Sequence, residues 1–193
     1  MKIVIIKYNA GNVQSVLFAL EKLGYTAIIT DNVEEIRTAD KIIFPGVGEA
    51  SSAMSFLKGK NLDQAIKKLT QPVLGICLGM QLLCSHTEEG DVDYLGIFDV
   101  DVKKFRTDLK IPHIGWNLVE NNGEQLFSGI NIEPHCYFVH SYYADICEET
   151  TAITEYDNRF SSALQKDNFY GVQFHPEKSS EPGEQILKNF LLL

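Results

Sequence analysis

Short apolar runs alternate with amphipathic stretches along the first half of the chain. Four runs have the length and composition of buried strands, at residues 3–6, 27–29, 41–44 and 73–76. After the first run, apolar residues recur at helical spacing from Val13 to Leu20, with Asn12 as a plausible N-cap. This alternation predicts an α/β fold, in which helices flank both faces of a mostly parallel central sheet.

The pattern changes in the second half of the chain. Residues 87–91 predict a polar loop, and apolar and polar residues then alternate at 100–105, 114–119, 137–140, 152–156 and 160–165. Such alternation is typical of strands with one buried face, so we expect antiparallel or mixed additions to the sheet. A final helix has its apolar face at residues 184–192, and Pro182 and Gly183 mark its start. No repeat or linker divides the sequence, which predicts one domain over residues 1–193.

Length and charge narrow the class of protein. The 193 residues, 45% of them hydrophobic, suit one domain with a sizeable core. The net charge is −9, and an acidic surface repels phosphate backbones, so we expect no nucleic-acid partner. The sequence has no basic-then-apolar leader and no apolar run near the roughly 18 residues of a membrane span. We therefore expect a cytoplasmic protein that does not enter a membrane.

The cysteines and glycines give no sign of a metal or a nucleotide. Cys77, Cys84, Cys136 and Cys147 form no C-x-x-C pair and none of the spacings of zinc sites, so we expect free thiols and no metal. The turn after the first strand lacks the G-x-G-x-x-G pattern, so we expect no nucleotide cofactor.

The segment Gly75-Ile76-Cys77-Leu78-Gly79 is a candidate nucleophile turn. It has the G-x-nucleophile-x-G form that joins a strand to a helix, with Cys in place of Ser. Small residues on both sides avoid clashes at such a turn, and the helix N-terminus favours a thiolate. The N–H of Leu78 is then expected to be free to donate to an oxyanion. The alternative interpretation is a buried structural cysteine at a tight turn.

A base and an acid follow near the end of the chain, in His175-Pro176-Glu177. In an extended segment, residues two apart point to one face, so His175 and Glu177 can serve the same site. Glu177 would hold the imidazole tautomer while His175 takes the thiol proton. Since the carboxyl ends of parallel strands meet at one edge of a sheet, Gly46, Cys77 and His175 are expected there together. The alternative is an ordinary surface loop.

Together these residues resemble the class I (triad) glutamine amidotransferases, and within them the glutaminase subunits of imidazole glycerol phosphate synthases. The segments that carry the resemblance occur in order along the whole chain, at residues 44–48, 75–81, 112–117, 138–142 and 173–179. The cysteine turn and the His-Pro-Glu sequence are typical of the class. The His-x-Gly-Trp-Asn sequence at 113–117 and Lys178-Ser179 indicate the particular branch.

The resemblance implies a glutaminase with no cofactor, in which Cys77, His175 and Glu177 form the triad. The N–H of Val47 or Gly48 would be the second oxyanion donor beside Leu78, because the glycines around Val47 let that loop reorient. The residues implied to bind the substrate L-glutamine are Gly48, Gln81, Glu89, Ser141 and Tyr142.

The same resemblance implies a partner, a (β/α)8-barrel synthase subunit that forms a heterodimer and receives the ammonia. The residues implied at this interface are Asn12, His113, Trp116 and Lys178, where the alternatives are core packing or a solvated surface. One departure is Lys7-Tyr8-Asn9, where relatives commonly have Asp-Tyr-Gly. It puts in doubt any contact that the acid would make.

Two other functions stay open on the sequence. One is a related triad amidotransferase that serves pyridoxal phosphate, anthranilate or guanylate synthesis. The other is a regulatory module that keeps the fold without catalysis, against which the intact set of Cys77, His175 and Glu177 argues.

Overall fold

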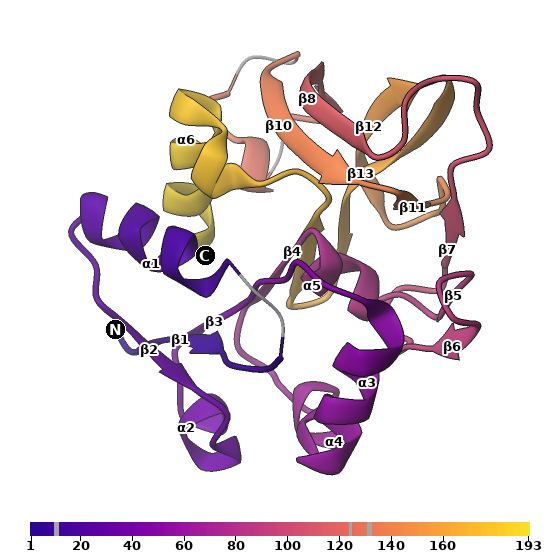
Figure 1. Cartoon of the computed structure of the whole chain (residues 1–193). Helices are drawn as coiled ribbons and strands as arrows, with labels where there is room; N and C mark the ends of the chain where they lie inside the picture. The colour runs from indigo at the N-terminus through magenta and orange to yellow at the C-terminus, as the bar shows by residue number, and fades with distance from the viewer. Residues whose placement is uncertain (10–11, 124, 131–132) are drawn as a thin grey trace.

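A sheet of short strands organises the chain in the computed structural model, which describes residues 1–9, 12–123, 125–130 and 133–193. Five strands at one end of this sheet are parallel, in the order β2-β1-β3-β4-β14 with β2 at the edge (Figure 1). Their bounds are Ile3–Ile6 for β1, Ala27–Thr30 for β2, Lys41–Phe44 for β3, Val73–Ile76 for β4 and Phe169–Val172 for β14. The predicted parallel α/β sheet is confirmed.

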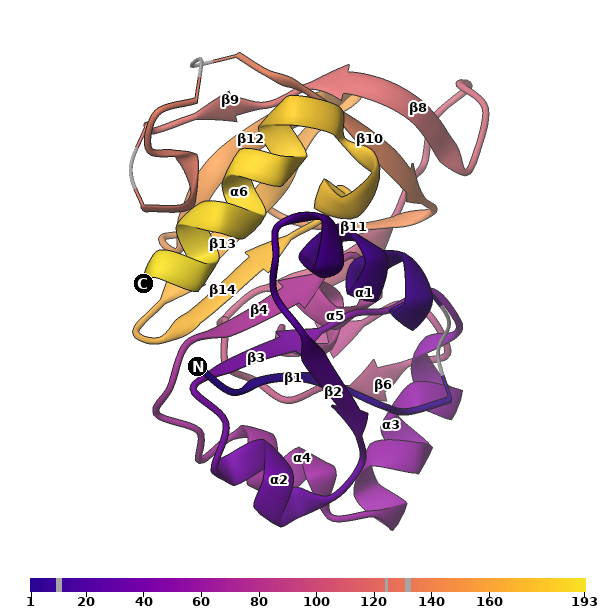
Figure 2. The same ribbon diagram turned by 90° about the vertical axis from the view of Figure 1, so that its left-hand side faces the viewer.

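Side chains of the parallel strands alternate between two hydrophobic cores. Ile3 and Ile5 face one core, and Val4 and Ile6 face the other, which is why the run is apolar throughout. Helices α1 (Val13–Lys22) and α6 (Ser180–Leu192) cover the first core, and they lie next to each other in Figure 2. The second core is covered by α2 (Val33–Arg37), α3 (Ala50–Gly59) and α4 (Leu62–Ile66).

Antiparallel and mixed strands extend the sheet beyond β14, as predicted for segments 100–105, 152–156 and 160–165; the prediction that segments 114–119 and 137–140 join this sheet is wrong. In the order β13-β11-β7-β5-β6, their bounds are Asn158–Lys166, Tyr142–Ala144, Asp101–Lys104, His86–Thr87 and Val92–Asp93. Strand β12 (Thr150–Tyr156) pairs with β13 and with β9 (Glu120–Asn121), followed by a 3-10 turn, η1 (Gln125–Phe127). Strands β8 (His113–Leu118) and β10 (His135–His140) form a separate antiparallel pair. The predicted loop at 87–91 begins within β5 and is the turn of the β5–β6 hairpin.

Helix α1 begins directly after Asn12, as predicted, but the capping hydrogen bond expected of Asn12 and the predicted start of the last helix are wrong. Asn12 precedes α1 with φ 70°, and its side chain makes no capping hydrogen bond; its Nδ2 instead donates to Glu177 Oε1. The last helix begins at Ser180, before Pro182, because proline is tolerated in a first turn, whose N–H groups have no partner within the helix.

The parallel register aligns the strand ends that carry the candidate site. Phe44 pairs with Gly75, and Val172 pairs with Ile76, so β3, β4 and β14 end at one edge. The chain turns from β4 into α5 (Leu78–Leu82) through Cys77, which has φ 53° and ψ −111°. A cysteine at positive φ is strained, and the strain is held by packing on both sides of the turn.

Close backbone contacts explain both glycines of this turn. A Cβ on Gly79 would lie 1.7 Å from the carbonyl oxygen of Phe44, and one on Gly75 would lie 2.8 Å from the backbone of Gly79. Both contacts are with main-chain atoms, which cannot rotate away as a flexible side chain can. Helix α5 therefore packs against the ends of β3 and β4 only when these two positions lack a side chain.

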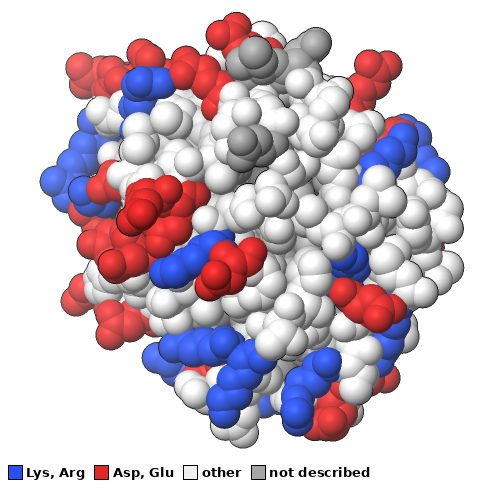
Figure 3. Space-filling model, turned by 180° about the vertical axis from the view of Figure 1, so that it is seen from behind, with Lys and Arg blue, Asp and Glu red and all other residues white. Residues whose placement is uncertain are grey.

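Charged side chains of both signs share the surface. On the face shown in Figure 3, acidic and basic side chains lie close together, and basic side chains gather at the lower edge of the view. The net charge of −9 is therefore not a uniform acidic coat. In the part of the chain that the structure describes, no helix combines the length and apolar composition needed to cross a membrane.

The glycine contacts give a stability prediction. Replacing Gly79 by Ala should lower the free energy of unfolding by about 2 kcal/mol or more, because α5 must shift away from Phe44. Gly59→Ala is the matched control: nothing lies within 4 Å of the added carbon in α3, so a change of no more than about 1 kcal/mol, in the stabilising direction, is expected. Urea unfolding measures both, and equal stabilities for the two variants would contradict the packing argument.

Candidate active site

His175 and Glu177 meet through a short turn that follows β14. Nδ1 of His175 lies 2.8 Å from Oε1 of Glu177, and their side chains are 1% and 0% exposed. The juxtaposition arises from the 3-10 turn η2 (Pro176–Lys178) rather than from an extended strand, so the predicted pairing is present but its predicted backbone is wrong. Because a carboxylate oxygen accepts, Nδ1 carries a proton, and in the neutral ring Nε2 has the lone pair that can take the thiol proton.

Charges around the imidazole favour its protonated form. Burial lowers the pKa of His175, but the neighbouring Cys77 and Glu177 together raise it by more than burial lowers it, so the net shift of the pKa is upward. Nε2 of His175 and Oε2 of Glu177 are both buried without a hydrogen-bond partner among the described residues. The raised pKa makes His175 a stronger acceptor for the proton of the Cys77 thiol, and Nε2 is the ring nitrogen left to take it.

The Cys77 sulfur is enclosed but not sealed. The residue is 6% exposed, and its sulfur lies 3.8 Å from the Val139 carbonyl oxygen and 3.6 Å from Nε2 of Gln173. It opens into a cavity of about 270 Å³. The other residues lining this cavity are Val47, Gly48, Leu78, Gln81, Glu89, Pro112, Val139, His140, Ser141 and Tyr142.

All five residues expected to bind glutamine line this one cavity with Cys77. Gln81 already uses its amide nitrogen, which donates to the Tyr142 carbonyl and to Gln173 Oε1, so its oxygen is the atom left for a ligand. Glu89 Oε2 accepts from the N–H of Ala50, and burial raises the pKa of Glu89. Sequence reasoning missed Pro112, Val139 and His140 as site residues, although all three lie in the segments 112–117 and 138–142 that carry the resemblance.

The oxyanion donor expected at Leu78 is not free, which corrects that prediction. Its N–H donates to the carbonyl oxygen of Gly46 at 3.2 Å. The loop that carries Gly46 also carries Val47 and Gly48, which line the cavity, and Gly48 has φ 152°. In this structure the chain's own carbonyl therefore lies where an oxyanion would accept from Leu78.

The four residues expected at a partner interface separate into two groups. Trp116 is 52% exposed, and Lys178 is exposed with Nζ 6.0 Å from the centre of the Tyr137 ring, which Trp116 also contacts edge-on. Asn12 instead holds the triad acid through its bond to Glu177. His113 is 3% exposed and stacked between Phe138 and Tyr156, so its predicted place at the surface is wrong.

His113 forms a buried histidine pair with His140. A carbonyl only accepts, so Nδ1 of His140 donates to Tyr142 at 2.8 Å, and Nε2 of His140 accepts from Nδ1 of His113 at 3.1 Å. Nε2 of His113 then accepts from Asn117 at 3.4 Å. Burial lowers the pKa of His113 to about 4 and, together with the other two histidines nearby, that of His140 to about 3. Both rings are neutral and their tautomers are fixed.

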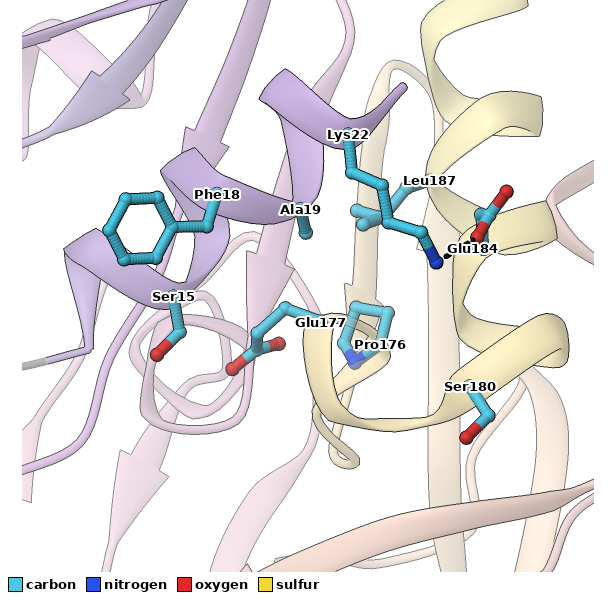
Figure 4. A pocket seen from close by; sticks show the side chains of 9 residues that line it. All are labelled: Ser15, Phe18, Ala19, Lys22, Pro176, Glu177, Ser180, Glu184 and Leu187. Atoms are coloured by element: carbon cyan, nitrogen blue, oxygen red, sulfur yellow. Dashed lines mark hydrogen bonds and ion pairs between the residues drawn. The ribbon is translucent and has the colours of Figure 1, made fainter. Parts of the chain in front are cut away.

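A second cavity, of about 350 Å³, meets the triad at its acid. Figure 4 shows Glu177 and Pro176 between α1 and α6, with the ion pair of Lys22 and Glu184 at one side. Although this cavity is the larger, neither the nucleophile nor the imidazole lines it. The smaller cavity is therefore the candidate active site. Among the described residues, no three His, Cys, Asp or Glu side chains are grouped to hold a metal.

A strained cysteine at a strand-to-helix turn, with a buried imidazole and carboxylate beside it, is the arrangement on which triad hydrolases of the α/β class depend. Comparison with known families agrees with this class: the family described as glutamine amidotransferase class-I matches residues 4–193. The chain belongs to the class-I glutamine amidotransferase family.

Several curated relatives cover the whole chain. It is 55% identical over 194 residues to the imidazole glycerol phosphate synthase subunit HisH of Bacteroides thetaiotaomicron, covering 99% of each. The proteins of the same name from Bacteroides fragilis and Idiomarina loihiensis are 56% and 47% identical, with at least 98% of each chain covered. Among solved structures, a glutamine amidotransferase has a TM-score of 0.78 at 17% identity, covering 98% of this chain and 97% of that one. A glutamine amidotransferase from Thermotoga maritima has a TM-score of 0.66 at 17% identity, covering 98% of this chain and 82% of that one. These two likenesses show the fold.

The neutral histidine pair predicts a loss of stability in acid. A histidine in an unfolded chain titrates near pH 6.5, so the unfolded state binds protons below that pH. In the folded state, His113 and His140 are protonated only near pH 4 and pH 3, respectively. As the pH falls from 6 to 5, each of these two histidines should lower the free energy of unfolding by up to about 1.4 kcal/mol per pH unit.

Urea unfolding of His113→Phe tests this, because the variant keeps the stacked ring and loses one titrating group. The acid slope should fall by up to the contribution of one histidine. His86→Gln is the control: Asp93 raises the pKa of exposed His86, so removing it should not reduce the slope. An unchanged slope in His113→Phe would contradict the neutral pair.

Proposed function

We propose that this chain is a glutaminase that hydrolyses L-glutamine to glutamate and ammonia for a partner synthase subunit. That subunit would make imidazole glycerol phosphate and AICAR in histidine biosynthesis. The observation that carries the proposal is the arrangement of Cys77, His175 and Glu177 at the cavity that Gln81, Glu89 and Tyr142 line. Curated relatives that cover the chain end to end bear the name of a subunit of this synthase. One domain over residues 1–193 and a cytoplasmic location fit the same proposal.

The chemistry begins at the sulfur. The Cys77 thiolate attacks the side-chain amide carbon of glutamine, and backbone N–H groups hold the tetrahedral oxyanion. His175 gives its proton to the departing ammonia, while Glu177 keeps Nδ1–H in place. Water then hydrolyses the γ-glutamyl thioester: His175 takes a proton from the attacking water, and the sulfur leaves as a thiolate, which releases glutamate and restores the starting pair of thiolate and protonated His175.

Substrate binding follows from the free polar atoms of the cavity. The Gln81 oxygen accepts from the glutamine amide, and the carboxylate of Glu89 meets the α-ammonium group. Gly48, Ser141 and Tyr142 complete the site with Val47 at its edge. Burial of Glu89 strengthens this pairing, since a desolvated carboxylate gains more from an ammonium partner than an exposed one does.

The partner is a (β/α)8-barrel subunit that docks over Trp116 and Lys178. Exposed Trp116 and Ile114, 52% and 54% accessible, lie on β8 beside Tyr137 and Lys178. Aromatic and cationic side chains of this kind dominate many protein interfaces. Ammonia is mostly protonated in neutral water and is then a poor nucleophile, so direct transfer between docked subunits preserves its reactivity.

Loss of the nucleophile separates the two half-reactions. Cys77→Ala should abolish glutamine-dependent synthesis by the complex and leave synthesis from added ammonium salts, which needs no thioester. Cys84→Ala is the matched control: this buried thiol donates to the Met80 carbonyl oxygen in α5, so its loss should affect stability but not chemistry. Measured glutamate release that persists in Cys77→Ala would rule out the proposed mechanism.

The occupied Leu78 N–H predicts that the chain alone hydrolyses glutamine poorly. While the Gly46 carbonyl accepts from Leu78, one oxyanion donor is missing, which lowers turnover by about 100- to 1000-fold. Rotation of the peptide between Gly46 and Val47 would remove that carbonyl and turn the Val47 N–H towards the site. Glutamate production should therefore rise by this factor when the partner and its substrate are added. Equal rates for the chain and the complex would refute the idea.

A further inference from the structure

The side chain of Gln173 lies between Cys77 and Gln81, two residues that line the glutamine cavity, and does not line that cavity itself. It is 0% exposed and follows β14, two residues before the triad histidine. Its Nε2 is 3.6 Å from the Cys77 sulfur, within hydrogen-bond range for sulfur, and its Oε1 is 2.9 Å from Nε2 of Gln81. Its backbone N–H donates to the Ser162 carbonyl at 2.9 Å, which anchors the residue to β13.

The direction of this hydrogen-bond chain is set by a carbonyl. The Tyr142 oxygen can only accept, so Gln81 must present its NH₂ group there, at 2.9 Å. The other hydrogen of that NH₂ group donates to Gln173, which must therefore present its oxygen to Gln81. The amide of Gln173 is planar, so its own NH₂ group is left on the side of the sulfur. No other orientation of the two amides satisfies both contacts.

The hydrogen bonding of the Cys77 sulfur changes when the thiol ionises. As a thiol, Cys77 can donate S–H to the Val139 carbonyl 3.8 Å away. As a thiolate it has no proton to donate, and a carbonyl oxygen near it becomes repulsive. Besides the imidazole of His175, whose pKa the Cys77 thiolate raises, the Gln173 N–H is the side-chain donor that contacts this sulfur among the described residues.

We propose that Gln173 is a positioning residue that holds the Cys77 thiolate through its side-chain N–H. This assignment rests on the proposed glutaminase function and deepens it. The fixed amide keeps the sulfur facing the cavity at a strained turn, where Cys77 has φ 53°. It also links the nucleophile, through Gln81, to the carbonyl that the buried histidine pair holds in place.

The test measures alkylation of Cys77, which needs neither glutamine nor a partner. Gln173→Met keeps the length of the side chain and removes the donor. Iodoacetamide modification of the Cys77 peptide, followed by mass spectrometry, should slow by about tenfold at pH 7, since hydrogen bonds to charged groups are worth at least that factor. The midpoint of its pH profile should move upward by about one unit.

Ser162→Ala is the matched control. This neighbour in the sheet is also 0% exposed, and its hydroxyl has no hydrogen-bond partner among the described residues, so its alkylation profile should match that of the unaltered chain. In the complex, Gln173→Met should lower kcat about tenfold and change KM by less than twofold, because Gln173 does not line the cavity. A folded Gln173→Met variant with alkylation within twofold of the unaltered chain at every pH would overturn the proposal.

A measurement on the native chain covers the case in which Gln173→Met does not fold. In protein with labelled glutamine, the side-chain amide resonances of Gln173 should shift as Cys77 ionises, and Cys77→Ala should abolish that dependence on pH. Amide resonances that are indifferent to Cys77→Ala would overturn the assignment. If the unaltered chain and its complex hydrolyse no glutamine, the proposed function fails, while both of these readouts still test Gln173.

Discussion

The contact between Gly79 and the carbonyl of Phe44 is the constraint on which the site depends. It lets α5 sit directly on the ends of β3 and β4, with no side chain between the backbones. That packing gives Cys77 a positive φ of 53° and directs its sulfur towards the cavity. The register of β14 with β4 then brings the segment after Val172, and so the imidazole, to the same edge.

The orientations of the polar side chains around Cys77 are fixed by oxygen atoms that accept hydrogen bonds and cannot donate them. The Tyr142 carbonyl receives hydrogen bonds from both Gln81 and His140, so it fixes an amide on one side and an imidazole on the other. The triad acid works in the same manner: Glu177 Oε1 accepts from His175 and from Asn12. Each arrangement starts from an oxygen that only accepts, and the protons of its neighbours follow from it.

The fold could be predicted from the sequence because its signals are local. Continuous apolar runs such as Ile3–Ile6 indicate strands buried on both faces, and glycines around Cys77 indicate a tight turn. Hydrogen-bond partners depend on residues far apart in the chain, so they could not be predicted in this way. Asn12 is an ordinary capping residue by sequence, yet it serves an acid 165 positions away.

Contacts between residues far apart in the chain also decide the roles of His113 and Gln173, which is why the sequence did not predict them. A histidine in a strand that alternates between faces can be buried or exposed, and only the stacking of Phe138 and Tyr156 decides in favour of burial. Gln173 lies inside a segment that marks the family, but its neighbour His175 has the chemistry that sequence reasoning looks for. The contact with the sulfur depends on Gln81, which is 92 positions earlier.

The bond between the Gly46 carbonyl and the Leu78 N–H makes the resting chain its own competitor for an oxyanion ligand. A glutamine analogue with an aldehyde in place of the amide forms a tetrahedral adduct with a thiol, and this adduct carries the oxygen that needs Leu78. Its affinity would then measure how far the Gly46 carbonyl has withdrawn, whereas glutamine itself would be bound almost equally before and after. Such an inhibitor would bind more tightly to molecules in which the Leu78 N–H is free than to those in which the Gly46 carbonyl occupies it, although both would bind glutamine in the same cavity.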